Sequence, residues 1–186
     1  WVVKAQIHSG ARGKAGGIKV CSTPEEVRAA ATELLGKKLV THQTGPAGKV
    51  VHRLYVEAAV PIKREIYIGL VLDRRSERVC VVAAPEGGME IEEIAAASPD
   101  TMLKVVIEPA VGMQPFQARE IAFGLKPNPS DITKAVKAIL GAYRAFRDPD
   151  ATMVEINPTA ITESGQVPAI RAQIPSAETD VYRPTP

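Results

Sequence analysis

The chain has 186 residues, a hydrophobic content of 45% and a formal net charge of +2. This length permits one large domain or two small lobes, and the composition is ordinary for a globular protein. The small net charge, without a long Lys/Arg run, argues against a dedicated nucleic-acid-binding protein, and no apolar run is long enough to span a membrane. Cys21 and Cys80 lack a metal-binding spacing, so we expect both to be reduced thiols that pack as small core residues.

The N-terminal stretch joins two β-type segments, residues 1–4 and 18–20, through a glycine-rich loop. Glycine lets successive backbone N–H groups turn toward an anion, and nearby cations add positive charge. These cations are Lys4, Arg12, Lys14 and Lys19. The loop favours a flexible cover over a polyphosphate, although a solvated basic hairpin would show the same pattern. It is not a P-loop, because no Gly-Lys-Ser/Thr sequence precedes a helix.

The whole of residues 1–60 predicts a small lobe with the element order ββαββ. A capping-box pattern at residues 23–26 is typical of a helix start, and Gly36 is typical of a helix end. Strands are expected at residues 39–43 and 50–60, on either side of a turn. These elements predict a small antiparallel sheet with one helix packed on it.

Residues 61–174 predict a larger lobe, and residues 175–186 predict a Pro-rich tail. Alternating apolar residues indicate strands in this region, and apolar residues at helical spacing indicate helices. The expected elements are a hairpin at 65–84, an acidic turn at 86–88, a helix at 91–97, a strand at 102–107, a helix at 116–123 closed by Gly124, a helix at 131–147 capped by Ser130, a strand at 152–156 ending at Asn157-Pro158, and a closing hairpin at 160–172.

Four polar residues are candidates for binding or chemistry. Glu57 ends a strand near the predicted junction of the lobes, where a carboxylate could hold a base and a ribose, and Glu65 has the same possible role. Glu155 and Asn157 share one face of a strand, and their oxygens suit Mg²⁺. The alternatives are surface-strand glutamates and a strand closed by an Asx-Pro turn. No Ser-His-Asp or Cys-His arrangement indicates nucleophilic catalysis.

Seven runs, taken together in their order and spacing, carry a resemblance to a known family. They are residues 1–4, 10–17, 36–44, 56–59, 65–69, 86–92 and 155–158. The chain resembles the ATP-grasp domain of the succinyl-CoA synthetase (succinate–CoA ligase, ADP- or GDP-forming) β-subunit family, which includes malate–CoA ligase, from Trp1 to about Thr162. The resemblance implies an α+β ATP-grasp fold, in which two lobes grip a nucleotide in the cleft between them.

The resemblance also implies a reaction and a role for individual residues. The reaction is succinate + CoA + ATP (or GTP) ⇌ succinyl-CoA + ADP (or GDP) + phosphate, a step of the tricarboxylic acid cycle that passes through a phosphohistidine on the α subunit. The implied contacts are Lys4, Ala11, Arg12 and Gly13 with the nucleotide phosphates, Glu57 and Val60 with the adenine or ribose region, Glu65 with the ribose or phosphates, Asn157 with Mg²⁺, and Glu155 with the phosphohistidine loop of the α subunit. The implied compartment is the bacterial cytoplasm or the mitochondrial matrix.

The chain departs from the family pattern in three places. Ala11 replaces a usual glycine, and Arg171 stands where the family has an Asp that ligates Mg²⁺. Either this copy is impaired, or the alignment fails after Gly165, or the guanidinium replaces part of the charge of the metal; Glu163 and Glu178 are possible substitute carboxylates. The chain also begins at Trp1 without Met, so we expect a piece of a longer protein whose other parts bind CoA and succinate.

Two other readings remain open from the sequence. A degenerate ATP-grasp module could hold a nucleotide or a partner chain without catalysis, and Arg171 favours this reading. An ATP-citrate lyase or citryl-CoA synthetase relative would share the grasp fold, but it fits the glycine-rich loop less well. For the ligase reading, the resemblance implies that this chain alone is incomplete for the full reaction and could at most bind the nucleotide.

Overall fold

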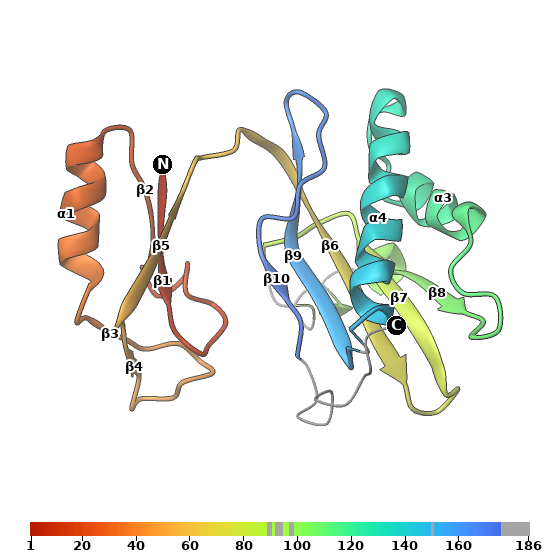
Figure 1. Ribbon diagram of the computed structural model, residues 1–186, viewed down its shortest axis with the longest axis horizontal. Helices are drawn as coiled ribbons and strands as arrows, with labels where there is room; N and C mark the ends of the chain where they lie inside the picture. Colours follow the sequence, from red (N-terminus) through yellow and green to blue (C-terminus); the bar gives the residue numbers. More distant parts are fainter. Residues whose placement is uncertain (89–90, 92–94, 97–98, 150, 176–186) are drawn as a thin grey trace. The chain divides into compact units, whose positions relative to one another are not determined.

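The computed structural model describes residues 1–88, 91, 95–96, 99–149 and 151–175. The chain divides into two compact units, with the boundary between Val60 and Pro61 (Figure 1). The predicted helix at 91–97 and the predicted tail at 175–186 fall largely outside the described residues, and so does Glu178. Among the helices that are described, none is both long enough and apolar enough to cross a membrane.

The first unit contains a three-stranded antiparallel sheet with the strand order β2-β1-β5. Its strands are β1 (Val2–Gln6), β2 (Ile18–Val20) and β5 (Arg53–Glu57). Helix α1 (Pro24–Leu34) packs on one face of this sheet, where Val3 and Leu34 are fully buried (Figure 1). Because side chains alternate along a strand, Lys4 points to the other face.

Helix α1 begins and ends where the sequence predicts. The Glu26 backbone N–H donates to the Thr23 hydroxyl at 3.2 Å, and the Ser22 N–H donates to the Glu26 carboxylate at 2.6 Å. Gly36 follows the helix with a φ of +77°, a left-handed conformation that glycine adopts without steric cost. The local sequence therefore specifies both ends of this helix.

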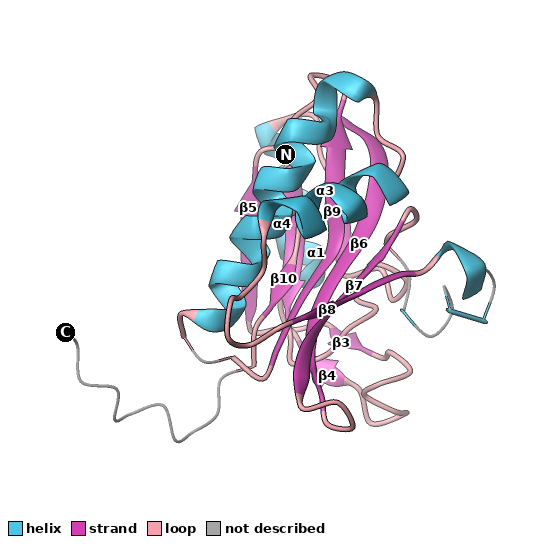
Figure 2. Cartoon of the chain, turned by 90° about the vertical axis from the view of Figure 1, so that its right-hand side faces the viewer, coloured by secondary structure: helices cyan, strands magenta, loops and turns pink. Residues whose placement is uncertain are grey.

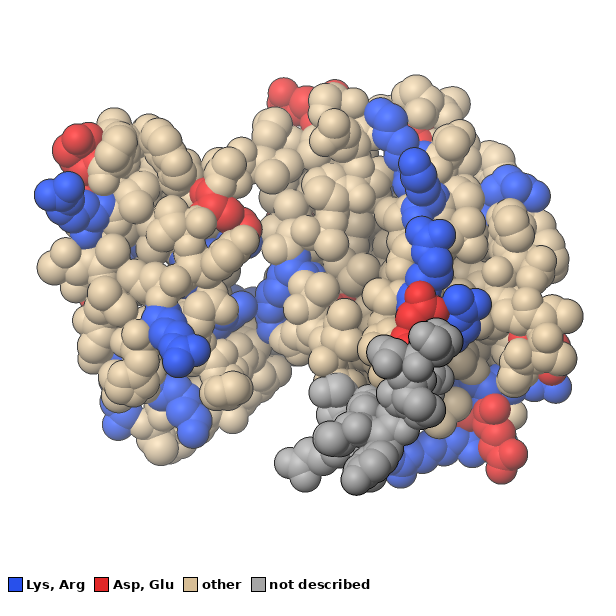
Figure 3. Space-filling model, viewed as in Figure 1, with Lys and Arg blue, Asp and Glu red and all other residues tan. Residues whose placement is uncertain are grey.

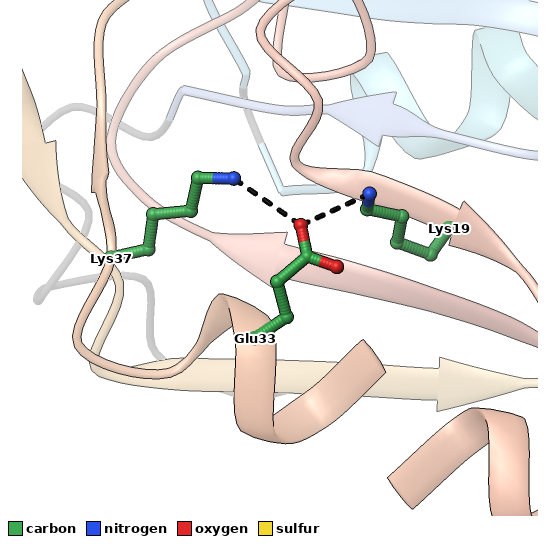
Figure 4. A network of polar contacts seen from close by, with 3 residues as sticks. All are labelled: Lys19, Glu33 and Lys37. Atoms are coloured by element: carbon green, nitrogen blue, oxygen red, sulfur yellow. Dashed lines mark hydrogen bonds and ion pairs between the residues drawn. The ribbon is translucent and has the colours of Figure 1, made fainter. Parts of the chain in front are cut away.

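Glu33 ties α1 to the strand and loop beside it (Figure 4). Its carboxylate oxygen lies 3.1 Å from Lys19 Nζ and 3.3 Å from Lys37 Nζ. The hydrogen bonds from Lys19 and then Lys37 hold the pKa of the Glu33 carboxyl below its usual range. Lys19 is paired opposite Val3 and so lies on the α1 side of the sheet. Lys19 therefore shares its charge with Glu33 on the α1 side of the sheet.

The strands expected at 39–43 and 50–60 are shorter in the structure. A separate two-stranded pair consists of β3 (Lys38–Leu39) and β4 (Lys49–Val50), and β5 ends at Glu57. The Thr41 N–H donates to the Thr44 hydroxyl oxygen at 2.9 Å, and the Thr44 hydroxyl contacts the Thr41 C=O at 3.1 Å. These bonds satisfy backbone groups that a strand would pair with a neighbour, so the chain turns there.

The second unit contains a five-stranded antiparallel sheet in the order β10-β9-β6-β7-β8, with two helices, α3 and α4, on one face (Figure 2). The core between sheet and helices includes Ile68, Leu70 and Ile139. The predicted 65–84 hairpin, the strand at 102–107 and both helices are confirmed. The element bounds are β6 (Ile62–Asp73), β7 (Arg78–Ala84), η1 (Pro99–Thr101), β8 (Leu103–Ile107), α3 (Pro115–Gly124), η2 (Pro129–Asp131), α4 (Ile132–Arg147), β9 (Met153–Thr162) and β10 (Ala172–Gln173).

Helix α4 is amphipathic, as its sequence predicts. Its buried face includes Ala135, Ile139 and Tyr143, at the spacing of successive helical turns. Its outer side is basic, and Figure 3 shows Lys and Arg side chains following this helix along the surface. Ser130 is not its N-cap, because Asp131 holds that position at the end of a 3-10 turn.

Strand β9 does not end at Asn157-Pro158, contrary to the sequence-based expectation. It continues through this cis peptide bond to Thr162, because it has pairing partners on both sides. Strand β6 pairs with it from Ile62 to Val71, and on the other side the Asn157 N–H donates to the Arg171 C=O at 3.0 Å. The expected closing hairpin is present, with the Thr162 N–H donating to the Gln166 C=O at 3.0 Å.

Both cysteines pack as the sequence predicts. Cys21 and Cys80 are free thiols, and both are buried. Cys21 belongs to the core of the first unit, whereas Cys80 lies on β7 in the second unit. Burial raises the pKa of the Cys80 thiol, so this group stays neutral and behaves as a small apolar side chain.

Candidate functional site

Lys4 and Glu57 form an ion pair on the sheet face of the first unit that is opposite to α1. The register pairs Val2 with Glu57 and Lys4 with Tyr55, so Lys4 and Glu57 are diagonal neighbours on adjacent strands. Their side chains are 13% and 30% exposed, respectively. Partial burial makes this interaction stronger than it would be in water and holds both groups at a fixed place on the sheet.

Exposed apolar side chains surround this pair. Ile18 and Tyr55 lie opposite Lys4 on the two neighbouring strands, and Val20 lies opposite Val2. Ile18, Val20 and Tyr55 are 36%, 78% and 55% exposed. An apolar surface that contains one lysine and one carboxylate offers contacts to a flat base, to a ribose hydroxyl and to a phosphate.

The glycine-rich loop of the first unit folds back on β1. Arg12 Nη1 donates to the Ala5 C=O at 2.6 Å, and the Gly17 N–H donates to the Arg12 C=O at 2.8 Å. Ala11 has a φ of +54°, a left-handed conformation that costs a residue with a Cβ about 1–2 kcal/mol. Glycine would avoid this cost, which is a physical reason why the family pattern has glycine where this chain has Ala11.

A turn that the sequence analysis assigned to a strand braces this loop. The Gly10 N–H donates to Gln43 Oε1, and the Ser9 and Thr41 hydroxyls lie 2.6 Å apart. An ideal Cβ at Gly10 would be 2.8 Å from Gln43 Nε2, so a larger residue there would displace the end of the Gln43 side chain. The sequence signal for this contact between the turn and the loop was that every residue from 41 to 44 has a polar side chain that can hydrogen-bond. Such a run is typical of local turns.

Two other predicted contact residues of the first unit lie away from the ion pair along the chain. Gly13 belongs to the loop, where an ideal Cβ would be 3.6 Å from Ile18 Cδ1, an ordinary contact. Val60 lies beyond the end of β5 and is 37% exposed. The structure thus brings Lys4 and Glu57 together, while the roles of Gly13 and Val60 stay predictions.

The second unit has its own polar cluster, on the sheet face opposite to α3 and α4. The Gly88 N–H donates to Asn157 Oδ1 at 2.8 Å, and Asn157 Nδ2 lies 3.5 Å from Glu155 Oε1. The Glu65 carboxylate lies against Gly88, so closely that a Cβ there would overlap it. Three predicted site residues, Glu65, Glu155 and Asn157, therefore meet around the turn at 86–88.

Gly87 sets the position of this turn, because an ideal Cβ on it would lie 2.6 Å from the Ile66 carbonyl oxygen. Backbone cannot move aside as a side chain can, so we expect Gly87→Ala to lower the free energy of unfolding by about 1–3 kcal/mol. Urea denaturation of the parent and the variant would measure the difference.

Gly141→Ala is the matched control for this substitution. Gly141 lies in α4, and the nearest atom to its ideal Cβ is Arg144 Nη2 at 4.0 Å. We expect this variant to be more stable than the parent by about 0.5–1 kcal/mol, because alanine favours the helix. Equal stability of Gly87→Ala and the parent would contradict the packing seen at the turn.

The donor set around Asn157 does not fit a Mg²⁺ ion. The residue across the strand pair is Arg171, whose positive charge opposes a divalent cation, and one lone pair of the Asn157 carboxamide oxygen accepts the Gly88 N–H. Glu163 lies in the hairpin turn, six residues along the chain and hence up to about 20 Å away. The residues described contain no group of three His, Cys, Asp or Glu side chains that could hold a metal. The charge of Arg171 therefore opposes the Mg²⁺ role expected for Asn157.

These two α+β units, with a glycine-rich loop on the first, define a chain of the ATP-grasp type. The chain belongs to the ATP-grasp domain family, whose family model matches residues 1–161. The predicted fold class and the family resemblance are thereby confirmed.

Curated relatives agree with this family. The chain is 54% identical over 183 residues to the probable malate–CoA ligase subunit beta of Mesorhizobium japonicum, covering 98% of this chain and 46% of that protein. It is 51% identical over 183 residues to the succinate–CoA ligase [ADP-forming] subunit beta of Bacillus subtilis, covering 98% of this chain and 48% of that protein. The chain thus spans about half the length of these relatives.

A solved structure of ATP citrate lyase from Methanothrix soehngenii, in complex with citrate and coenzyme A, shares the fold. Its TM-score is 0.68 at 17% identity, and the match covers 93% of this chain and 37% of that chain. A dinucleotide-forming acetyl-coenzyme A synthetase from Ca. Korarchaeum cryptofilum matches with a TM-score of 0.59 at 19% identity, covering 93% of this chain and 74% of that chain. At these identities the likeness concerns the fold alone.

Proposed function

We propose that this chain is the nucleotide-binding part of an acid–CoA ligase β subunit, most simply of succinate–CoA ligase (ADP-forming). The observation that carries the proposal is the Lys4–Glu57 pair within an exposed apolar sheet face, next to the glycine-rich loop. The relatives at about half identity, which are β subunits of succinate–CoA and malate–CoA ligases, support it. The seven sequence stretches that carry the family resemblance support the same function.

The proposed roles follow from the charge and place of each side chain. Lys4 neutralises phosphate oxygens, and Arg12 can do so when it leaves the Ala5 carbonyl. Glu57 accepts a hydrogen bond from a ribose hydroxyl or a base amine. Glu155 would help to seat a phosphohistidine loop supplied by an α subunit. Mg²⁺ is left without an assigned step, because the donor set does not fit it.

The proposed substrates and partners follow the ligase reading. The nucleotide is ATP or GTP, and the phosphoryl group passes to a histidine of an α subunit before it reaches the acid and CoA. Succinate and CoA would bind to parts of the enzyme outside this chain. Because both of these relatives come from bacteria, we place the enzyme in a bacterial cytoplasm.

Calorimetric titration of the chain with ATP, ADP and adenosine tests the nucleotide-binding part of this proposal. We expect ATP and ADP to bind at least about tenfold more tightly than adenosine, since the cations act on phosphates. Equal affinity for adenosine and ATP, or no binding of ATP at millimolar concentration, would overturn the proposal.

A second candidate function is a nucleotide-binding module that does not transfer phosphate, and Arg171 beside Asn157 favours it. A chimera separates the two. This chain would replace the matching half of the Bacillus subtilis β subunit, and the complex with that enzyme's α subunit would be assayed for succinate-dependent ADP formation. Activity supports the ligase, whereas ATP binding by an intact complex without ADP formation supports the second candidate.

A further inference from the structure

Arg171 and Asn157 are cross-strand partners in the second unit. Strand β10 pairs Ala172 with Ile156, and one residue further the Asn157 N–H donates to the Arg171 C=O at 3.0 Å. Residues directly opposite each other on antiparallel strands point to the same face, with Cβ atoms about 4.5–5.5 Å apart. The Arg171 side chain therefore emerges on the same sheet face as the Asn157 carboxamide.

That face already holds two carboxylates, and neither neutralises this guanidinium. Glu155 lies two residues from Asn157 on β9, and Glu65 lies against the turn at Gly88. Within the part of the chain that the structure describes, Arg171 makes no ion pair or side-chain hydrogen bond, and it is only partly exposed. Its donors remain available for an anion that approaches this face.

A guanidinium at this place changes what the polar cluster can bind. A cation opposite Asn157 repels a divalent metal ion that approaches the Asn157 carboxamide oxygen. Arginine presents parallel N–H donors that match two oxygens of a phosphate, and it stays protonated at every physiological pH. The Arg171 guanidinium is thus suited to hold two oxygens of a phosphate on this face.

We propose that Arg171 binds the phosphates of the nucleotide directly and replaces the charge of a protein-bound divalent cation in this unit. The proposal rests on the function proposed above, because it takes the ligand to be a nucleotide. Its consequence is specific: nucleotide affinity should depend little on Mg²⁺, and it should depend strongly on the guanidinium of Arg171.

Calorimetric titration with ATP, in excess Mg²⁺ and in EDTA, tests this for the parent, Arg171→Gln and Arg171→Asp. We expect the dissociation constant of the parent to change less than about threefold between the two conditions, and that of Arg171→Gln in EDTA to rise at least about tenfold. Arg171→Asp should bind poorly in EDTA and recover affinity in Mg²⁺, because an aspartate beside Asn157 supplies a second metal-binding oxygen.

Arg144→Gln is the matched control, because Arg144 is exposed on the basic side of α4. It should bind ATP as the parent does in both conditions, and circular dichroism would confirm that every variant is folded. A loss of more than tenfold for the parent in EDTA, or unchanged binding by folded Arg171→Gln, would overturn the role of Arg171. If the parent binds no ATP in either condition, the proposed nucleotide-binding function itself is wrong.

Discussion

Lys4→Met should weaken ATP binding by roughly 30-fold, the largest effect on affinity that we expect from one substitution in the first unit. A charge-assisted hydrogen bond contributes about 1.5–3 kcal/mol, and 2 kcal/mol corresponds to about 30-fold in the dissociation constant. Lys4 is the more buried partner of its ion pair, so water screens its charge only partly. Calorimetric titration of both proteins with ATP provides the measurement.

Lys49→Met is the control for this prediction, because Lys49 is an exposed lysine on β4 of the same unit. It should bind ATP like the parent, since it lies outside the sheet that carries Lys4. The Lys4→Met protein must also melt as a folded protein, because methionine leaves Glu57 without its cation. If folded Lys4→Met binds ATP as tightly as Lys49→Met does, the sheet face with the Lys4–Glu57 pair is not the phosphate site.

Leu70→Ala should lower the free energy of unfolding of the second unit by about 3 kcal/mol. Leu70 has no solvent-exposed surface and belongs to the main core cluster between the sheet and helices α3 and α4. Its strand neighbours are Val81 on β7 and Val154 on β9, so truncation leaves a cavity that the surrounding backbone cannot fill. Leu→Ala changes in such cores cost about 2–5 kcal/mol.

Leu72→Ala is the control that shows whether burial, and not the leucine residue type, causes the loss of stability. Leu72 lies two residues further along β6, points to the same side of the strand and is 53% exposed. Its truncation should change stability by no more than about 0.5 kcal/mol. Urea denaturation monitored by circular dichroism gives both values from the transition midpoints. Similar losses for the two variants would mean that the described core does not hold the second unit together.

The sequence by itself determined the features that depend on neighbours in the chain. The ends of α1 are set by Thr23, Glu26 and Gly36, which interact within a few residues. The hairpin of β6 and β7 follows from alternating apolar residues around a four-residue turn. The runs that carry the family resemblance also lie within short stretches, and together they predicted the ATP-grasp fold that the family model confirms.

Candidate residues in the two clusters were also named from the sequence, but their partners were not. Nothing local indicates that Lys4 is paired with Glu57, or that the Asn157 carboxamide accepts a bond from Gly88. The strand register decides such pairings, and register depends on which distant strands meet. The same reason explains why the pairing of Lys19 with Glu33 on α1 was not predicted.

Only the tertiary structure decided the conformation where contacts with distant residues override the local sequence pattern. The turn at 41–44 replaced an expected strand because Gln43 and Thr41 brace a loop more than 30 residues earlier in the chain. Strand β9 continued past Asn157 because β6 and the segment ending in β10 supply hydrogen-bond partners on both sides. Backbone groups must be paired when they are buried, so distant strands overrode the Asx-Pro turn signal and set Arg171 opposite Asn157.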